Sequence, residues 1–118
     1  MFDVLVVHKM RKLYIYVYMI GNKLPKRDKL GIHSYIEKEF LQTFSTLINA
    51  SLEPKSEKIT SVKKARLQIE TLKQLFRTEY ETKIITEKVY LNIELKLQEI
   101  SKMTNGWLKY LQTQNPPN

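Results

Sequence analysis

The sequence has no cysteine in its 118 residues, so disulfide frameworks, thiolate catalysis and cysteine-ligated zinc sites are excluded. It has only three glycines and no glycine-rich phosphate-binding loop. Its most apolar run, residues 13–20, is far shorter than the roughly 20 residues that a membrane-spanning helix needs. The short apolar start lacks the preceding positive charge of a secretory signal. We therefore expect a cytoplasmic protein that is not exported and has no membrane partner.

Groups that could carry catalysis are equally sparse. The only two histidines are His8 and His33, and neither belongs to the Glu-x-x-His pattern of di-iron bundles. The carboxylates of Glu79 and Glu81 are two residues apart, so they would point to different faces of a helix. The sequence therefore predicts no catalytic residue, no metal site and no cofactor, and the protein is not expected to be an enzyme.

Positive charge is what the chain has in excess. It contains 20 Lys and Arg residues against 12 Asp and Glu residues, which gives a formal net charge of +8. A basic surface favours approach to a polyanion such as nucleic acid. The same charge is compatible with solubility alone, and both interpretations stay open at this point.

Turn-forming residues divide the chain into four segments. The divisions fall at residues 21–25, 51–56 and 82–86, and Gly21 and Asn22 are suited to ending a helix. Thr86 is placed to cap the start of the last helix. We expect one domain over residues 1–113, followed by a frayed polar tail over residues 114–118.

The last three segments repeat apolar residues at spacings of three and four, which is typical of a helix with one buried face. In the second segment these residues are Ile32, Ile36, Phe40, Thr43, Leu47 and Ala50. In the third they are Val62, Ala65, Ile69, Leu72, Phe76 and Tyr80. In the fourth they are Tyr90, Ile93, Leu97, Ile100, Thr104, Trp107 and Leu111. Trp107 is expected to pack in the core, with base stacking as the alternative.

The first segment alternates branched aliphatic residues and tyrosines over 13–20, a pattern also typical of a strand. A single strand would have no partner in an otherwise helical chain, so a helix buried on nearly all sides is the better interpretation. Four helices with short connections predict an all-α, antiparallel up-down four-helix bundle. Because one bundle buries a single stripe of each helix, we also expect a homo-oligomer.

Several stretches in this order resemble the Avd-like four-helix-bundle proteins, and the resemblance covers roughly residues 12–111. A Leu-Pro pair with a basic cluster precedes Leu-Gly and Ile-Glu, and a Gly-Trp pair closes the last helix. The matching stretches are 24–31, 35–37, 47–50, 64–67, 72, 75–77 and 100–108. A sister group from ribosomal-RNA intervening sequences shares the fold, but its Asn-Ile-Ala-Glu-Gly stretch is absent from residues 47–52.

The resemblance implies an accessory subunit of a diversity-generating retroelement. Members of this family form pentamers of four-helix bundles and bind RNA and the retroelement's reverse transcriptase. It therefore implies a homopentamer that binds nucleic acid, RNA or DNA, and a reverse transcriptase. The alternative is an oligomeric bundle whose partner is a protein and whose charge is incidental.

Three groups of basic residues are candidate contacts to phosphate, and each has a plainer interpretation. The first connection is either a phosphate-binding loop or a solvated loop. The N-terminal cluster is either a docking patch for a polyanion or an acidic partner, or the polar side of a helix. The stripe on the third segment is interrupted by Glu70, which favours a surface helix with salt bridges. We expect residues 8, 11 and 12 to share one helix face. The candidates are Lys9, Arg11 and Lys12; Lys23, Lys26, Arg27 and Lys29; and Lys63 and Arg66, whose stripe continues to Lys73 and Arg77.

Overall fold

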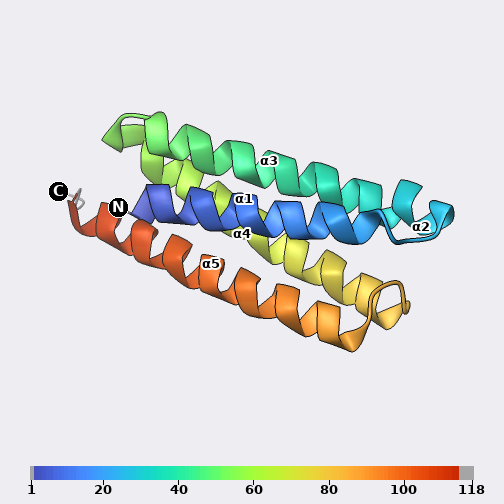
Figure 1. Cartoon of the computed structure of the whole chain (residues 1–118). Helices are drawn as coiled ribbons and strands as arrows, with labels where there is room; N and C mark the ends of the chain where they lie inside the picture. The colour runs from blue at the N-terminus through green and yellow to red at the C-terminus, as the bar shows by residue number, and fades with distance from the viewer. Residues whose placement is uncertain (1, 115–118) are drawn as a thin grey trace.

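The computed structural model describes residues 2–114, which form four long helices and one short helix (Figure 1). The long helices are α1 (Phe2–Gly21), α3 (Ile32–Leu52), α4 (Lys55–Glu81) and α5 (Glu87–Gln114). The short helix α2 (Lys26–Leu30) lies in the first connection. No strand occurs within the described residues. The predicted all-α fold is therefore confirmed.

The four long helices pack side by side into a bundle that measures 53 × 20 × 20 Å. Each long helix packs mainly against two other long helices, in the order α1, α3, α4, α5 and back to α1, so that α1 and α4 lie diagonally opposite each other. Neighbouring helices run in opposite directions, as Figure 1 shows. This is the expected antiparallel up-down arrangement.

The first segment is a helix and not a strand. It buries one stripe toward the bundle, formed by Val6, Met10, Leu13, Val17 and Gly21. These buried residues are three and four apart, which is the period of a helix. The alternation of tyrosines and aliphatic residues over 13–20 makes this period hard to recognise in the sequence. The expectation that this helix is buried on nearly all sides was wrong for the single chain, because Val4 is 70% exposed and Met19 is 56% exposed.

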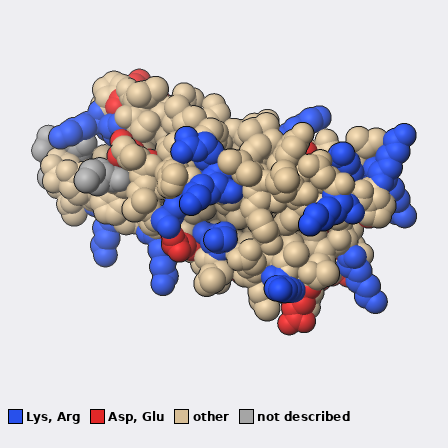
Figure 2. Space-filling view, viewed as in Figure 1, with Lys and Arg blue, Asp and Glu red and all other residues tan. Residues whose placement is uncertain are grey.

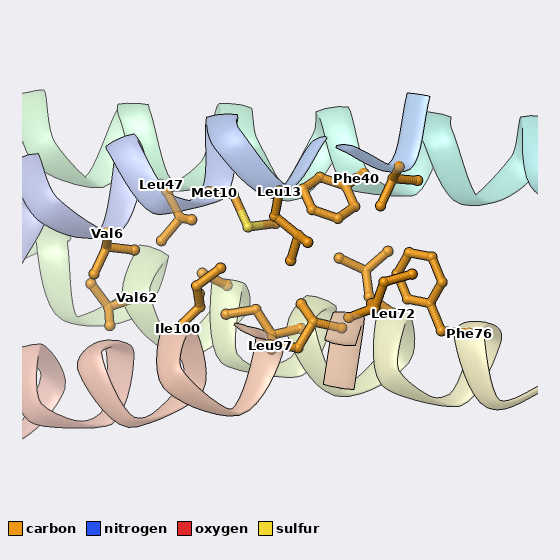
Figure 3. Packing of buried hydrophobic residues seen from close by; sticks show 14 of the residues in the cluster. Val6, Met10, Leu13, Phe40, Leu47, Val62, Leu72, Phe76, Leu97 and Ile100 are labelled. Carbon is orange, nitrogen blue, oxygen red and sulfur yellow. The ribbon is translucent and has the colours of Figure 1, made fainter. Parts of the chain in front are cut away.

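The core runs along the bundle axis, where side chains from all four long helices meet (Figure 3). Each fully buried aliphatic or aromatic side chain contributes about 1.5–3 kcal/mol through removal from water. Trp107 is 4% exposed, so its core packing is confirmed. The predicted seam residues are all buried: Ile36, Phe40, Ile69, Leu72, Phe76, Ile93, Leu97, Ile100 and Trp107.

Two tyrosines expected on the seam lie at its edge instead. The rings of Tyr80 on α4 and Tyr90 on α5 are half-buried and stack with centroids 4.7 Å apart and planes 5° apart. The buried position at this end of α4 belongs to Glu79, which has no exposed surface. The helical period of α4 therefore turns a carboxylate, not a phenol, toward the interior.

The helix connections follow the predicted divisions. The Thr86 hydroxyl accepts a hydrogen bond from the backbone N–H of Val89 at 3.2 Å, which confirms the predicted cap of α5. The ammonium group of Lys58 donates to the carbonyls of Ala50 and Ser51, at 2.7 and 3.0 Å, and so satisfies the end of α3. Of the tail expected over 114–118, Gln114 ends α5 and the rest lies outside the described residues.

Candidate nucleic-acid interface

The first group of predicted cations lies at one end of the bundle, on α2 and the turn before it. Lys23, Lys26, Arg27 and Lys29 are all exposed. Within residues 2–114, none of these four side chains forms an ion pair. Figure 2 shows Lys and Arg side chains gathered at this end. The structure therefore presents the first-connection cluster to solvent as one group.

Helix α2 is held by its flanking residues. The carbonyl of Pro25 accepts hydrogen bonds from the backbone N–H groups of Asp28 and Lys29, at 3.0 and 2.9 Å. At the other end, a Cβ atom on Gly31 would lie 2.7 Å from the carbonyl oxygen of Arg27. Because only glycine fits there, Gly31 permits the sharp bend between α2 and α3 that fixes the direction of the basic cluster.

The connection between α4 and α5 meets α2 and adds a cation that the sequence analysis missed. A cavity of about 570 Å³ lies between the two connections, and both Arg27 and Lys83 line it. Lys83 has a φ angle of 63°, in the left-handed region, where the chain turns between the helices. Lys83 follows Arg27 by 56 positions in the chain, so their proximity could not be predicted from the sequence.

In helix α1, residues 8, 11 and 12 are three and four apart and share one face, as expected, but the basic side chains of the cluster line two different hollows. Arg11 donates a hydrogen bond to Nδ1 of His8 at 3.1 Å, and both residues line a cavity near the end of α3. Lys9 and Lys12 instead line a groove between α1 and α5. The cluster therefore borders α5 on one side of α1 and the end of α3 on the other.

The third group lies on α4, which is diagonal to α1. Lys63 and Arg66 are exposed and line one hollow with Glu70 and Leu67, and Leu67 is 72% exposed. The rest of the stripe is neutralised in pairs, because Lys73 pairs with Glu70 at 3.1 Å and Arg77 with Glu81 at 3.2 Å. Lys63 and Arg66 are thus separated from the α1 cations by the width of the bundle.

A buried polar pair lies near the α2 end of the core, and sequence reasoning missed it. Nδ1 of His33 on α3 lies 2.8 Å from Oε2 of Glu79 on α4, and Nε2 donates to the carbonyl of Val17 on α1 at 3.0 Å. His33 is 1% exposed. A Cβ atom on Gly21 would lie 2.8 Å from Cδ2 of this ring, so glycine makes room for it.

The charges around His33 set its protonation. Burial lowers the pKa of His33, but the hydrogen bond and negative charge of Glu79, the Val17 carbonyl and the charge of Glu37 together raise it above its ordinary value of 6.5. Nε2 of His33 lies 3.7 Å from the nearer Glu37 oxygen. These contacts therefore favour the protonated form of His33, which in that form makes a buried ion pair with Glu79 and links α1, α3 and α4.

Within residues 2–114, no group of three or more acidic, histidine or cysteine side chains is placed to hold a metal ion. No helix in the same part of the chain is both long and apolar enough to cross a membrane. The surface offers cationic groups and one side of α1 on which exposed apolar and basic residues are mixed. On this side Val4, Leu5, Ile15, Tyr18 and Met19 are 49–70% exposed and lie among the exposed His8, Arg11 and Lys12.

Together these features define an all-α, four-helix-bundle protein with a basic surface. The sequence model of the bAvd-like family matches residues 4–111, which is nearly the whole chain, and the chain therefore belongs to the bAvd-like family. The match begins earlier in α1 than the resemblance noted above, which started near residue 12. No curated protein and no solved structure matches the chain.

Proposed function

We propose that this chain is a non-enzymatic accessory protein of a diversity-generating retroelement that binds nucleic acid and the partner reverse transcriptase through its basic surface. The observation that carries the proposal is the exposed cationic cluster on α2 in a member of the bAvd-like family. Flexible ammonium and guanidinium groups on a fixed turn suit contact with phosphates, which are regularly spaced and independent of base sequence. Binding is therefore indifferent to sequence, on RNA or DNA.

The charge distribution supports this assignment. Residues 1–31 hold seven Lys and Arg residues against Asp3 and Asp28, whereas residues 32–53 hold only Lys38 against three glutamates. Residues 54–118 hold twelve Lys and Arg residues against seven glutamates, so the net charge is +5 over residues 1–31, −2 over residues 32–53 and +5 over the twice longer stretch 54–118. The positive charge is therefore densest along residues 1–31. Lys83 adds to it at the end where α2 meets the connection after α4.

A salt titration of nucleic-acid binding tests the proposal. Each phosphate that the protein neutralises steepens the plot of log affinity against log salt by about 0.7–0.9. Replacing Lys26, Arg27 and Lys29 together by glutamate is expected to flatten this slope and to weaken binding to all sequences alike. The measurement is fluorescence anisotropy with labelled RNA and DNA of mixed sequence.

The matched control changes the same charge elsewhere. Lys55, Lys102 and Lys109 are exposed on the half of the bundle away from α2, and replacing them by glutamate alters the net charge equally. If both triple variants lose the same slope and affinity, the α2 cluster is not the contact surface and only net charge matters. An unchanged circular dichroism spectrum confirms that each variant is folded.

The reverse-transcriptase partnership and the cytoplasmic location follow from the same assignment. The family's role as a retroelement subunit supports both, since reverse transcription of the element's RNA takes place where that RNA is made. A reverse-transcriptase gene beside this one, and co-purification of its product with this chain in high salt, are the expected observations. If an intact reverse transcriptase from the neighbouring gene does not co-purify with this chain, the partnership is contradicted.

The exposed apolar residues on the outer side of α1 favour a second candidate, an oligomeric interaction bundle without a nucleic-acid role. Ile15 and Met19 are 55% and 56% exposed on this side. A homo-oligomer, for which the family implies a pentamer, would cover this side. Apolar association persists in high salt, whereas phosphate binding weakens steeply, so salt separates the two functions.

A further inference from the structure

The groove between α1 and α5 gathers cations that are far apart in the sequence. Lys9 and Lys12 come from α1 and Lys96 from α5, and these three lysines share the groove with a single carboxylate, Glu99. Figure 2 shows Lys and Arg side chains gathered over the middle of this face, across α1 and α5. The groove therefore carries a net positive charge that Lys96, absent from the sequence-based candidates, helps to create.

The spacing of the helices explains this convergence. On α1, residues 9, 12, 13 and 16 are three, four and seven apart, which places them on one face. On α5, residues 96, 99 and 100 repeat the same spacing. Because α1 and α5 are antiparallel neighbours, the two faces meet and border an open cavity of about 340 Å³. Cavities of about 300 Å³ and more are in the range that accommodates small ligands.

The walls of the groove are not all polar. Tyr16 is half-buried with its ring against the core, while Leu13 and Ile100 form an apolar floor. Proteins that bind single-stranded nucleic acid combine a cationic groove for the backbone with aromatic side chains on which bases stack. A duplex keeps its bases paired inside a wide cylinder, so it can touch the rim of a narrow groove but cannot enter it.

We propose that the α1–α5 groove is a binding site for one nucleotide of a single-stranded nucleic acid. Its phosphate contacts Lys9, Lys12 and Lys96, and its base stacks against Tyr16. The proposal rests on the proposed nucleic-acid function and assigns one site within it. Glu99 forms an ion pair with Lys9, and both side chains remain partly exposed. An arriving phosphate must replace the Glu99 carboxylate at Lys9, so Glu99 competes with the ligand.

Because Glu99 competes with phosphate, two substitutions in neighbouring turns of α5 are expected to change the affinity for a single strand in opposite directions. Lys96→Glu removes one phosphate contact and is expected to flatten the salt slope for a single strand by about 0.7. Glu99→Gln removes the competing charge and is expected to tighten binding. Lys102→Glu is the matched control, because Lys102 is exposed on α5 and does not line the groove.

Fluorescence anisotropy with labelled oligothymidylate, as a single strand and as a duplex with oligoadenylate, is the test. We expect the parent to prefer the single strand, and we expect Tyr16→Leu to weaken single-strand binding about tenfold with little effect on the duplex. A parent that prefers the duplex, or equal effects of Lys96→Glu and Lys102→Glu, would overturn the groove as the site and leave the proposed function standing.

A second arm separates a nucleic-acid strand from a free nucleotide as the source of the phosphate. Thymidine monophosphate is added to the parent while amide signals are followed by NMR. Shifts around the groove without any oligonucleotide binding would overturn the nucleic-acid function and the single-strand binding site, and would leave a site for a free nucleotide. Oligonucleotide binding with shifts centred on the groove is the result that supports the proposal.

Discussion

The His33 imidazole and the Glu79 carboxylate lie 2.8 Å apart although 46 residues separate them in the chain. Both side chains are buried, and the second oxygen of Glu79, Oε1, has no hydrogen-bond partner within the described residues. Removing one member of a buried ion pair leaves the other charge without compensation. The pair therefore links α3 to α4 firmly and makes the link depend on protonation.

The raised pKa of His33 predicts that the bundle loses stability as the pH rises. The folded state binds the His33 proton more tightly than the unfolded chain, so the contribution is complete below the ordinary pKa of 6.5 and disappears as the pH passes through the raised value. Urea unfolding across this window is the measurement. The variant Glu79→Gln is expected to flatten the dependence and to lower the free energy of unfolding by about 1–3 kcal/mol. A flat parent profile would contradict the ion pair.

Gly21→Ala is expected to destabilise the protein, although alanine favours a helix by about 1 kcal/mol over glycine. The added Cβ atom would meet the buried His33 ring at 2.8 Å, so the net loss is about 1–3 kcal/mol. Gly106→Ala is the matched control, since its Cβ atom would meet only the partly exposed Phe2 ring, at 3.2 Å. Denaturant unfolding that ranks the two variants equally would contradict the packing role of Gly21.

Thr86→Ala is expected to lower the free energy of unfolding by about 1 kcal/mol, because it removes the hydroxyl that caps α5. Thr71→Ala changes the same side chain in the interior of α4, where the hydroxyl only bonds to the carbonyl of Leu67 at 3.1 Å. That control is expected to be neutral or slightly stabilising, since alanine is the better helix former. Thermal unfolding of both variants checks the difference.

Ile15→Glu is expected to dissociate the proposed homo-oligomer without unfolding the chain. Ile15 is 55% exposed on the outer side of α1, so a charge there costs the single chain little but would be buried in an interface. Leu67→Glu on the diagonal helix α4 is the control, because Leu67 is 72% exposed. Light scattering gives the mass of each variant. A parent that is already a monomer at micromolar concentration would contradict the oligomer.

The helices were predictable from the sequence because their evidence is local. The spacing of Ile93, Leu97 and Ile100 indicates a buried helix face, regardless of which helix packs against it. Thr86 caps the residues that directly follow it in the chain. Helix α2 was not predictable in this way. Its five residues are too few for a periodic pattern, and its position depends on the close approach of Gly31 to Arg27.

The cationic groups were predictable in part. The cluster on α2 is contiguous in the chain, so its members stay together in the structure. Lys96 and Lys83 were missed because their neighbours come from other helices, and an apolar pattern does not say which helices are adjacent. Glu79 was missed because a carboxylate is normally exposed, and its partner His33 was visible only as an isolated histidine.

The described chain starts and finishes at the same end of the bundle, where the rings of Phe2 and Tyr110 lie 6.0 Å apart. The α2 cluster lies at the opposite end (Figure 1). A short linker from the end of α5 back to α1 would therefore close the polypeptide into a loop with little distortion. Opening that loop between α3 and α4 would yield a circular permutant in which each helix keeps its neighbours, and surface attachment through the original ends would leave the α2 cluster facing the solution.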